Sequence, residues 1–298
     1  MKIVVFGGAG FIGHHLVKRL REIGNEVRAV DNLFHPCKAE YGGEIGDIRD
    51  FEDILAHVKW ADLVYNLAAQ IHVDRSIKNP QETIDINVSG ALNILEACRI
   101  HNKKLIFASS SEVYGSSQTE FMAENHPLDA KSPYGASKVA GDRLCRAYID
   151  TYGMDIAIVR NFNTFGPYQD DTSYGGVIAI FTRQALNNKP ITIFGAGNQE
   201  RDYMYINDAL EAYIKVQKFT GEINFGTGKT ITIRDLALMI KKITNSSSEI
   251  INLPPRPGEV MRLCAGIGKA GYLGFRPNTE LERDLGRYIE WYKKFNNV

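Results

Sequence analysis

The stretch Lys2-Ile-Val-Val-Phe-Gly-Gly-Ala-Gly-Phe-Ile-Gly13 decides the fold of this chain. Its first apolar residues predict a buried strand, and the spacing of apolar residues over Phe11–Ile23 predicts a helix. Glycines between a strand and a helix permit a tight turn, and they let backbone approach a pyrophosphate that the helix N-terminus attracts. The stretch therefore predicts a dinucleotide site on a strand–turn–helix unit, formed by Gly7, Gly10, Phe11, Ile12 and Gly13.

An acidic residue ends the next predicted strand, Glu26–Asp31. A carboxylate in that place accepts hydrogen bonds from a ribose diol and repels a 2′-phosphate, so NAD is predicted rather than NADP. Residues at other strand ends are expected to line the same cofactor: Asn32, Asp47, Ile48, Leu67, Ala68 and Ala69. For Asp47 and Ile48 the alternative is a loop acid and a core isoleucine, and for the alanines it is simple close packing.

Strands and helices alternate through the first half of the chain, which predicts an α/β fold with a Rossmann-like, doubly wound parallel sheet. The further strands are expected at Leu63–Ala68, Leu105–Ser109 and Asp155–Asn161, and the further helices at Phe51–Val58, Gln81–His101 and Pro133–Tyr152.

Turn-rich sequence after Asn163 predicts a smaller, partly interleaved C-terminal domain. We expect residues 1–165 to form the NAD-binding domain, with a return segment near 203–226 that includes the strand-like Ile223–Gly226. Residues 166–202 and 227–298 are then expected to form the substrate domain.

The composition excludes several classes of function. The chain has 298 residues, 44% of them hydrophobic, and a formal net charge of zero. A neutral chain does not favour nucleic-acid or membrane-surface binding, and no apolar run reaches membrane-spanning length. The four cysteines and seven histidines lack paired or metal-ligand spacing, so free thiols, no metal and a cytoplasmic location are expected.

Two polar clusters carry the chemistry. Tyr134 and Lys138 are four residues apart in Ser132-Pro-Tyr-Gly-Ala-Ser-Lys138, so a helix places them on one face. A lysine ammonium there can lower the pKa of a phenol and make it a base. Upstream, Ser109-Ser-Ser-Glu-Val-Tyr-Gly115 follows a predicted strand, so hydroxyls could bind substrate and Glu112 could be a general base. Either cluster alone could be an ordinary helix or turn.

Taken together and in this order, these motifs resemble the extended short-chain dehydrogenase/reductase family over nearly the whole chain. Further matching runs are Arg160–Tyr168, Gln199–Tyr205 and Arg256–Glu259. The resemblance implies an NAD-dependent enzyme that acts on a nucleoside-diphosphate sugar. It also implies these substrate contacts: Asn163 to the sugar or diphosphate, and Arg201 with either Arg256 or Arg262 to the phosphates. Arginine forks suit diphosphates.

The resemblance also implies the first chemical step. Tyr134 takes the proton of the sugar's 4-hydroxyl while carbon 4 gives hydride to NAD⁺, helped by Lys138 and a serine hydroxyl of Ser110 or Ser111. The resulting 4-ketone is then turned over by 4-epimerases, used for loss of water by 4,6-dehydratases, and used for loss of carbon dioxide by decarboxylases.

Glu112 favours 4,6-dehydration, because it stands where dehydratases and decarboxylases of this family carry a base. The run His72–Ile77 also looks like dTDP-glucose 4,6-dehydratases. Against this, Ser111 replaces their aspartate, and Tyr174–Phe181 reads more like a 4-epimerase. We therefore expect a 4,6-dehydratase, with a UDP-glucose-type 4-epimerase as the alternative. Decarboxylase and net reductase are less favoured, because no cation for a sugar carboxylate can be placed and Asp31 disfavours NADPH.

Two further expectations follow from the resemblance. The helices Gln81–His101 and Pro133–Tyr152 correspond to those that commonly form a four-helix bundle in a homodimer of this family. A non-catalytic dinucleotide sensor is the remote alternative to an enzyme. Such proteins usually lose the Tyr-x-x-x-Lys pair, which is intact here.

Overall fold

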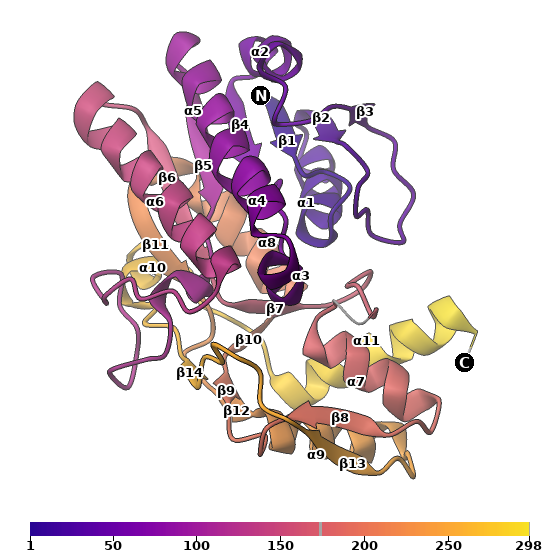
Figure 1. Ribbon diagram of the computed structural model, residues 1–298. Helices are drawn as coiled ribbons and strands as arrows, with labels where there is room; N and C mark the ends of the chain where they lie inside the picture. Colours follow the sequence, from indigo (N-terminus) through magenta and orange to yellow (C-terminus); the bar gives the residue numbers. More distant parts are fainter. Residues whose placement is uncertain (173–174, 298) are drawn as a thin grey trace.

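Seven parallel strands form the central sheet in the computed structural model, which describes residues 1–172 and 175–297 (Figure 1). Their order is β11-β6-β5-β4-β1-β2-β3, so the chain runs outward from β1 to one edge and then from β4 to the other. The predicted doubly wound sheet is confirmed. The strands are β1 (Lys2–Phe6), β2 (Glu26–Asp31), β3 (Glu44–Ile45), β4 (Leu63–Asn66), β5 (Lys104–Ala108), β6 (Ile156–Asn161) and β11 (Gly221–Phe225).

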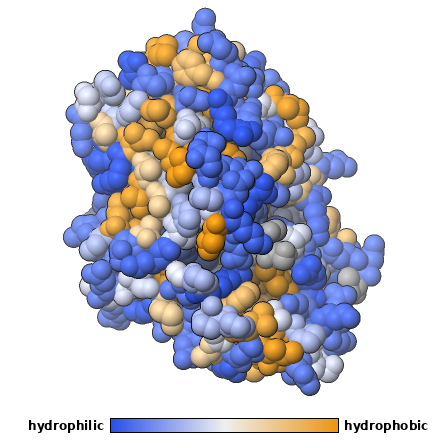
Figure 2. All heavy atoms as spheres, viewed as in Figure 1, coloured by the Kyte–Doolittle hydropathy of each residue, from blue (hydrophilic) through white to orange (hydrophobic). Residues whose placement is uncertain are grey.

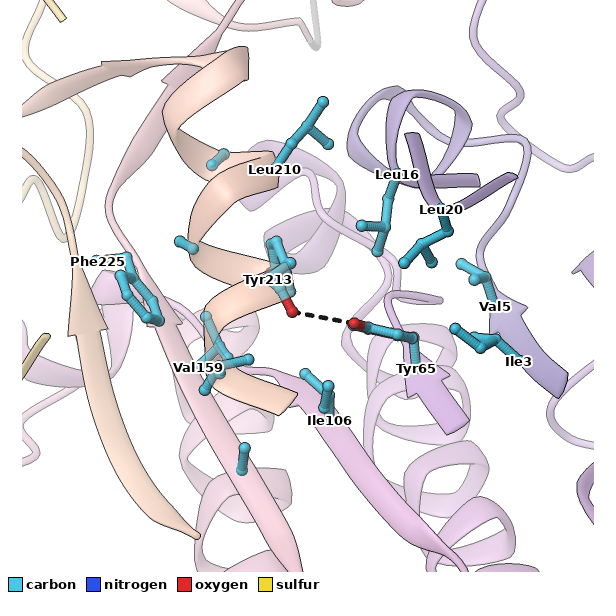
Figure 3. Packing of buried hydrophobic residues seen from close by; sticks show 14 of the residues in the cluster. Ile3, Val5, Leu16, Leu20, Tyr65, Ile106, Val159, Leu210, Tyr213 and Phe225 are labelled. Carbon is cyan, nitrogen blue, oxygen red and sulfur yellow. Dashed lines mark hydrogen bonds between the residues drawn. The ribbon is translucent and has the colours of Figure 1, made fainter. Parts of the chain in front are cut away.

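Both faces of this sheet are buried, as expected for a parallel sheet covered by helices. Successive side chains of a strand point to opposite faces, so Ile3 and Val5 enter one core while Val4 and Phe6 enter the other. The first core lies against α1 (Phe11–Glu22) and α8 (Ile206–Lys215). Figure 3 shows this packing, in which the Tyr65 hydroxyl donates to the Tyr213 carbonyl at 3.0 Å.

The second core lies under the helices of the opposite face. They are α2 (Phe51–Trp60), α5 (Gly90–Ile100) and α6 (Pro133–Tyr152). Helix α6 begins as its sequence predicts: the Ser132 hydroxyl accepts from the Gly135 N–H at 3.0 Å and Pro133 occupies the first turn. The predicted helix Gln81–His101 is in fact interrupted. It consists of α4 (Pro80–Ile84), one π-helical turn η1 (Asp85–Ser89) and α5.

A second lobe lies below the carboxyl ends of the central strands (Figure 1). Its own core is shared by α7 (Val177–Leu186), α9 (Ile233–Thr244) and α11 (Leu281–Asn296). Its strands form small sheets: β8 (Ile191–Phe194) with β13 (Ile250–Leu253), and β9 (Glu200–Arg201) with β12 (Ile231–Thr232) and β14 (Arg262–Leu263). Strands β7 (Asn163–Phe165) and β10 (Tyr203–Tyr205) pair where the chain passes between the lobes.

The expected return of the chain to the first sheet is present, because β11 pairs in parallel with β6. The exact division into domains stays a prediction. The remaining short elements are α3 (Val73–Lys78), η2 (Ser111–Tyr114), η3 (Val216–Lys218) and α10 (Gly268–Tyr272). Within the described ranges, no helix is long and apolar enough to cross a membrane, no cluster of metal-ligating side chains occurs, and all four cysteines are free thiols.

Candidate active site

The glycine turn lies between β1 and α1, where the sheet order reverses direction. Gly7 has φ +82°, and a Cβ atom on it would lie 2.6 Å from the Ala68 backbone nitrogen. A Cβ on Gly13 would lie 2.0 Å from the Gly7 carbonyl oxygen. Only glycine therefore allows β1, α1 and the end of β4 to approach this closely. Open α/β sheets bind their ligands at such a switch point.

Asp31 ends β2 beside this turn. Its carboxylate accepts from the Ala9 N–H at 3.0 Å and from the Leu33 N–H at 2.8 Å. The acid is thereby tied to the glycine turn and held where a ribose next to the pyrophosphate would lie. These residues fit a dinucleotide: a turn that a Cβ would block, the first turn of α1 at Phe11 and Ile12, and a fixed acid.

Leu67, Ala68 and Ala69 follow β4 directly and are only partly buried. The Leu67 N–H donates to the Phe6 carbonyl at 2.9 Å, so this segment continues alongside β1. The structure therefore brings Leu67 and Ala68 to the glycine turn, and the contact of Leu67, Ala68 and Ala69 with the cofactor stays a prediction.

Asp47 and Ile48 lie differently from each other. Asp47 is held by Arg49 and by the Asn32 amide at 2.9 Å, and the Arg49 guanidinium keeps the pKa of this carboxyl well below its usual range. Ile48 is buried in the second core, where a Cβ on Gly90 would lie 2.6 Å from it. Ile48 is thus a core residue, as the alternative interpretation expected, and a contact between Ile48 and adenine stays a prediction.

The serine cluster and Tyr134 meet as predicted. After β5, the Ser110 hydroxyl accepts from the Glu112 N–H at 3.2 Å and starts the η2 turn. The Ser110 side chain lies beside the Tyr134 phenol and lowers its pKa against the effect of burial. The Tyr134 N–H in turn donates to the Ser76 hydroxyl of α3 at 3.0 Å. A hydroxyl of a bound substrate could therefore meet both the Ser110 hydroxyl and the phenol.

Lys138 lies one turn after Tyr134, but it does not lower the pKa of Tyr134 here as the sequence led us to expect. Burial raises the pKa of Tyr134 to about 12 and lowers the pKa of Lys138 to about 8. The Lys138 ammonium donates to the Ala108 carbonyl at 3.0 Å. Desolvation thus dominates the pKa shifts of both groups, and a positive charge on a cofactor bound beside them would favour the phenolate.

The lowered pKa of Lys138 predicts a pH-dependent stability. Between about pH 8 and pH 10.5 the unfolded chain keeps a proton that the folded chain has released, so stability rises with pH in this window. Urea unfolding of the wild type and of a Lys138→Met variant gives the difference between their free energies of unfolding. This difference should increase in favour of the wild type by up to about 3 kcal/mol between pH 8 and pH 10.5. Parallel pH profiles of the two proteins would contradict a buried lysine that loses its charge.

Glu112 is partly buried among charged residues of the second lobe. Burial raises the pKa of Glu112 above its ordinary value, Arg201 lowers it, and Glu259 raises it. Arg201 is held by Glu259 at 3.2 Å. Glu112 is thus a stronger base than a solvated glutamate, and one cation lies close enough to stabilise its carboxylate.

The three candidate arginines do not share one surface. In the small sheet, Arg262 is in register with Glu200, and Leu263 is in register with Arg201. Arg201 and Arg262 therefore point to opposite faces, and Arg262 pairs with Glu200 at 3.0 Å. Arg256 instead forms an ion pair at 3.1 Å with Asp74 of α3, the helix that also contacts Tyr134, and stacks on Phe194. Arg201 and Arg256 are thus linked to the catalytic side.

Asn163 lies in β7, in register with Tyr203 of β10. Within the described residues, its side-chain oxygen is buried without a hydrogen-bond partner. A buried acceptor of this kind is costly unless a ligand satisfies it, which agrees with the predicted substrate contact. Tyr174, part of the run that resembles epimerases, lies outside the described residues.

Two supporting residues were missed from the sequence. Ser76 fixes the start of α6, and Asn87 in the π-helical turn donates to the Gln70 carbonyl and to the Ser137 hydroxyl, each at 2.9 Å. Nothing in the sequence singles out Asn87, because polar residues recur throughout residues 81–101; in the structure it lies in a π-helical turn, an element that is frequent at functional sites.

The fold and this site define a dinucleotide-dependent enzyme with a tyrosine–lysine pair. A model of the NAD dependent epimerase/dehydratase family matches residues 3–225. One relative, the "Putative UDP-glucose 4-epimerase" of Methanocaldococcus jannaschii, is 40% identical over 307 residues, covering 99% of this chain and 100% of the relative. The chain belongs to the NAD dependent epimerase/dehydratase family, and its cofactor is NAD.

Solved structures agree with this assignment. A UDP-glucose 4-epimerase from Thermotoga maritima, solved with UDP-glucose, has a TM-score of 0.94 and 32% identity, with 99% of this chain and 100% of that one covered. A dTDP-glucose 4,6-dehydratase from Streptomyces venezuelae, solved with NAD, has a TM-score of 0.93 and 29% identity, with 100% and 98% covered.

Proposed function

We propose that this enzyme inverts carbon 4 of a UDP-hexose through a 4-keto intermediate. The observation that carries the proposal is the Tyr134 phenol beside the Ser110 hydroxyl, one helical turn from Lys138. This arrangement can hold a sugar hydroxyl and accept its proton, while bound NAD accepts and returns the hydride. The similarity to proteins named UDP-glucose 4-epimerases supports both inversion at carbon 4 and uracil as the nucleobase of the substrate.

The η2 turn supports inversion over elimination. Loss of water from carbon 6 needs a base for carbon 5 and an acid for the leaving hydroxyl. Glu112 can be that base, but Ser111, which is 3% exposed, is a very weak acid. Inversion needs neither group. It needs only that the 4-ketone can turn its other face to the cofactor.

A second candidate, 4,6-dehydration, is favoured by one specific observation. Glu112 has a pKa raised by burial and lies next to Arg201, which is suitable for a base that removes a proton next to a ketone. The sequence alone ranked this reaction first. The dehydratase from Streptomyces venezuelae shares the fold as closely as the epimerase from Thermotoga maritima does.

The substrate would be held between the lobes. We propose that Asn163 binds the sugar or diphosphate through its unpartnered side-chain oxygen or amide. Arg201 and Arg256 would bind the diphosphate, exchanging their contacts with Glu259 and Asp74 for phosphate oxygens. Arg262, on the other face of its small sheet, would support Arg201 only through the strand.

Product analysis by proton NMR tests this proposal. The purified enzyme is incubated with NAD and, in separate samples, with UDP-glucose, UDP-N-acetylglucosamine, UDP-glucuronate and dTDP-glucose. We expect the carbon-4 epimer of a UDP-sugar at equilibrium with its substrate. A 6-deoxy-4-keto product would show that the enzyme is a dehydratase, and a pentose product would show that it is a decarboxylase. If no sugar changed, the proposal that this protein acts on nucleotide sugars would be refuted, and a non-catalytic dinucleotide sensor would be the remaining interpretation.

A Glu112→Gln variant separates the two reactions. If the enzyme is an epimerase, we expect kcat to change less than about 10-fold, because inversion does not use this carboxylate as a base. If it is a dehydratase, general-base loss should lower kcat by on the order of 100-fold or more. Glu259→Gln is the matched control, since it removes a neighbouring carboxylate that is expected to have no proton-transfer role.

We also propose a homodimer through α5 and α6, which lie side by side on the outer face of the molecule (Figure 1). Leu92 and Ile100 of α5 are 38% and 51% exposed, and Tyr152 of α6 is 54% exposed. Figure 2 shows apolar side chains among the polar ones over this region. Exposed apolar residues on two neighbouring helices suit a self-complementary bundle.

Light scattering should therefore give twice the chain mass at micromolar concentration, and Leu92→Arg should shift it to one chain mass because a charge would be buried in the bundle. The control is Leu238→Arg, an equally apolar exposed position on α9 of the second lobe. A wild-type monomer, or equal behaviour of both variants, would contradict this interface.

A further inference from the structure

One ion pair is buried beneath the active site. Arg160, near the end of β6, and Asp142, on α6, have side chains that are 2% and 0% exposed. They meet as a two-pronged fork, with Nε to Oδ2 at 2.8 Å and Nη2 to Oδ1 at 2.9 Å. Removing two charges from water costs about as much as their attraction returns, so such a pair is weak evidence for stability. What it connects is therefore informative.

The pair holds both ends of the segment from Ser109 to Tyr114, which we call the catalytic turn. The Ser109 hydroxyl donates to Asp142 Oδ2 at 3.0 Å, and Arg160 Nη1 donates to the Tyr114 hydroxyl at 2.9 Å. Ser109 and Tyr114 flank the three residues predicted to act on substrate, Ser110, Ser111 and Glu112. The Tyr114 hydroxyl continues to the side chain of Asn224 in β11 at 2.7 Å, which anchors that end to the sheet.

The same pair is fixed to the helix that carries the tyrosine and the lysine. Tyr134, Lys138 and Asp142 follow one another at intervals of four residues in α6, so they lie along one face of it. A helix keeps these three side chains in fixed relative positions. A displacement of Asp142 relative to Arg160 is therefore a displacement of the Tyr134 phenol relative to the Ser110 hydroxyl.

We propose that the Asp142–Arg160 pair is a positioning device, which sets the distance between the catalytic turn and the tyrosine–lysine face of α6. Both are positioning residues, because they act through Ser109, Tyr114 and the helix. The proposal deepens the proposed function and rests on it for its kinetic test. It gives a role to a charged pair that lies where an apolar pair would pack.

The test replaces both charges together with apolar side chains, Asp142→Leu with Arg160→Met, so that neither charge is left buried alone. We expect a melting temperature near that of the wild type, since apolar replacement of a buried ion pair is often neutral. We expect kcat to fall by about 100-fold, because a misplacement of about 1 Å costs this much, while KM and NAD affinity change less than about 3-fold.

Arg143→Gln is the matched control. Arg143 also pairs with Asp142, but from a 44% exposed position and without a bond to the catalytic turn. It should keep the wild-type kcat. If the double variant does not fold, Ser109→Ala with Tyr114→Phe removes both ties to the turn and leaves the ion pair, and should lower kcat with KM unchanged.

Hydrogen exchange gives a readout that does not need a substrate. In the double variant the amides of residues 109–115 should exchange at least about 10-fold faster, with the rest of the sheet protected as in the wild type. Wild-type kcat together with wild-type exchange in this segment would overturn the proposal. If the wild type converts no nucleotide sugar, the proposed function fails, and the exchange of residues 109–115 still decides the positioning role.

Discussion

A Tyr134→Phe variant is expected to lose turnover by on the order of 1,000-fold while it still binds NAD. Tyr134 is 8% exposed, its phenol lies beside the Ser110 side chain, and its backbone N–H donates to the Ser76 hydroxyl at 3.0 Å. Phenylalanine fills the same space and removes only the oxygen that takes the proton. The effect should therefore appear in kcat, with the melting temperature and the NAD dissociation constant nearly unchanged.

Tyr152→Phe is the matched control for this experiment. Tyr152 ends the same helix and is 54% exposed, far from the Ser110 turn in sequence and structure. It should keep wild-type kcat. Retained turnover in Tyr134→Phe would mean that another group accepts the proton of the sugar hydroxyl.

Gly7→Ala is expected to have the second large effect, a loss of NAD affinity by on the order of 100-fold together with reduced stability. The residue has φ +82°, and its new Cβ would lie 2.6 Å from the Ala68 nitrogen and 2.7 Å from the Leu67 carbonyl carbon. Those atoms are backbone, so relief requires the end of β4 to move away from β1. That movement opens the crevice where the pyrophosphate is expected to bind.

Gly24→Ala separates the cost of the backbone conformation from the cost of the clash. Gly24 also has positive φ, +88°, but a Cβ there would meet nothing within 4 Å. It should lose about 1–2 kcal/mol of stability and keep full NAD affinity. Titration calorimetry with NAD and thermal unfolding measure both quantities. Equal NAD affinity in the two variants would contradict a turn whose close approach to β4 forms the site.

The first half of the fold was predictable because its signals are local. The strand–turn–helix at residues 2–23, the acid at the end of β2 and the cap Ser132 with Pro133 each depend on neighbours in sequence. Parallel order then follows from alternation of strands and helices. The four-residue spacing of Tyr134 and Lys138 predicts one helix face, and the neighbouring motifs gave that face its interpretation; the structure places the pair on α6 beside the serine turn.

The π-helical turn could not be predicted, because distant residues stabilise it. Asn87 bonds to Gln70 and to Ser137, residues 17 and 50 positions away. The local sequence of residues 81–101 indicates only helical periodicity. The same limit applies to the pKa of Tyr134, which burial raises to about 12 although the lysine spacing suggested the opposite direction.

The choice among the arginines depended on strand register. Arg201 and Arg262 were both candidates for binding the substrate phosphates, but their strands pair so that the two side chains point to opposite faces. Register is a tertiary property, and a shift of one residue reverses the faces. Ile48 is a similar case, because its core position depends on packing against distant residues such as Gly90.

The most direct test of inversion at carbon 4 is the fate of a deuterium on that carbon of the substrate. The enzyme with NAD is given UDP-glucose labelled with deuterium at carbon 4, and the products are followed by NMR. We expect UDP-galactose that keeps the deuterium on carbon 4, because the deuteride removed there is returned to the other face of the same carbon. Deuterium on carbon 6 would contradict inversion and show elimination of water. Unchanged UDP-glucose, together with no reaction of UDP-N-acetylglucosamine, would contradict the oxidation at carbon 4 that Tyr134, Lys138 and Ser110 are proposed to perform.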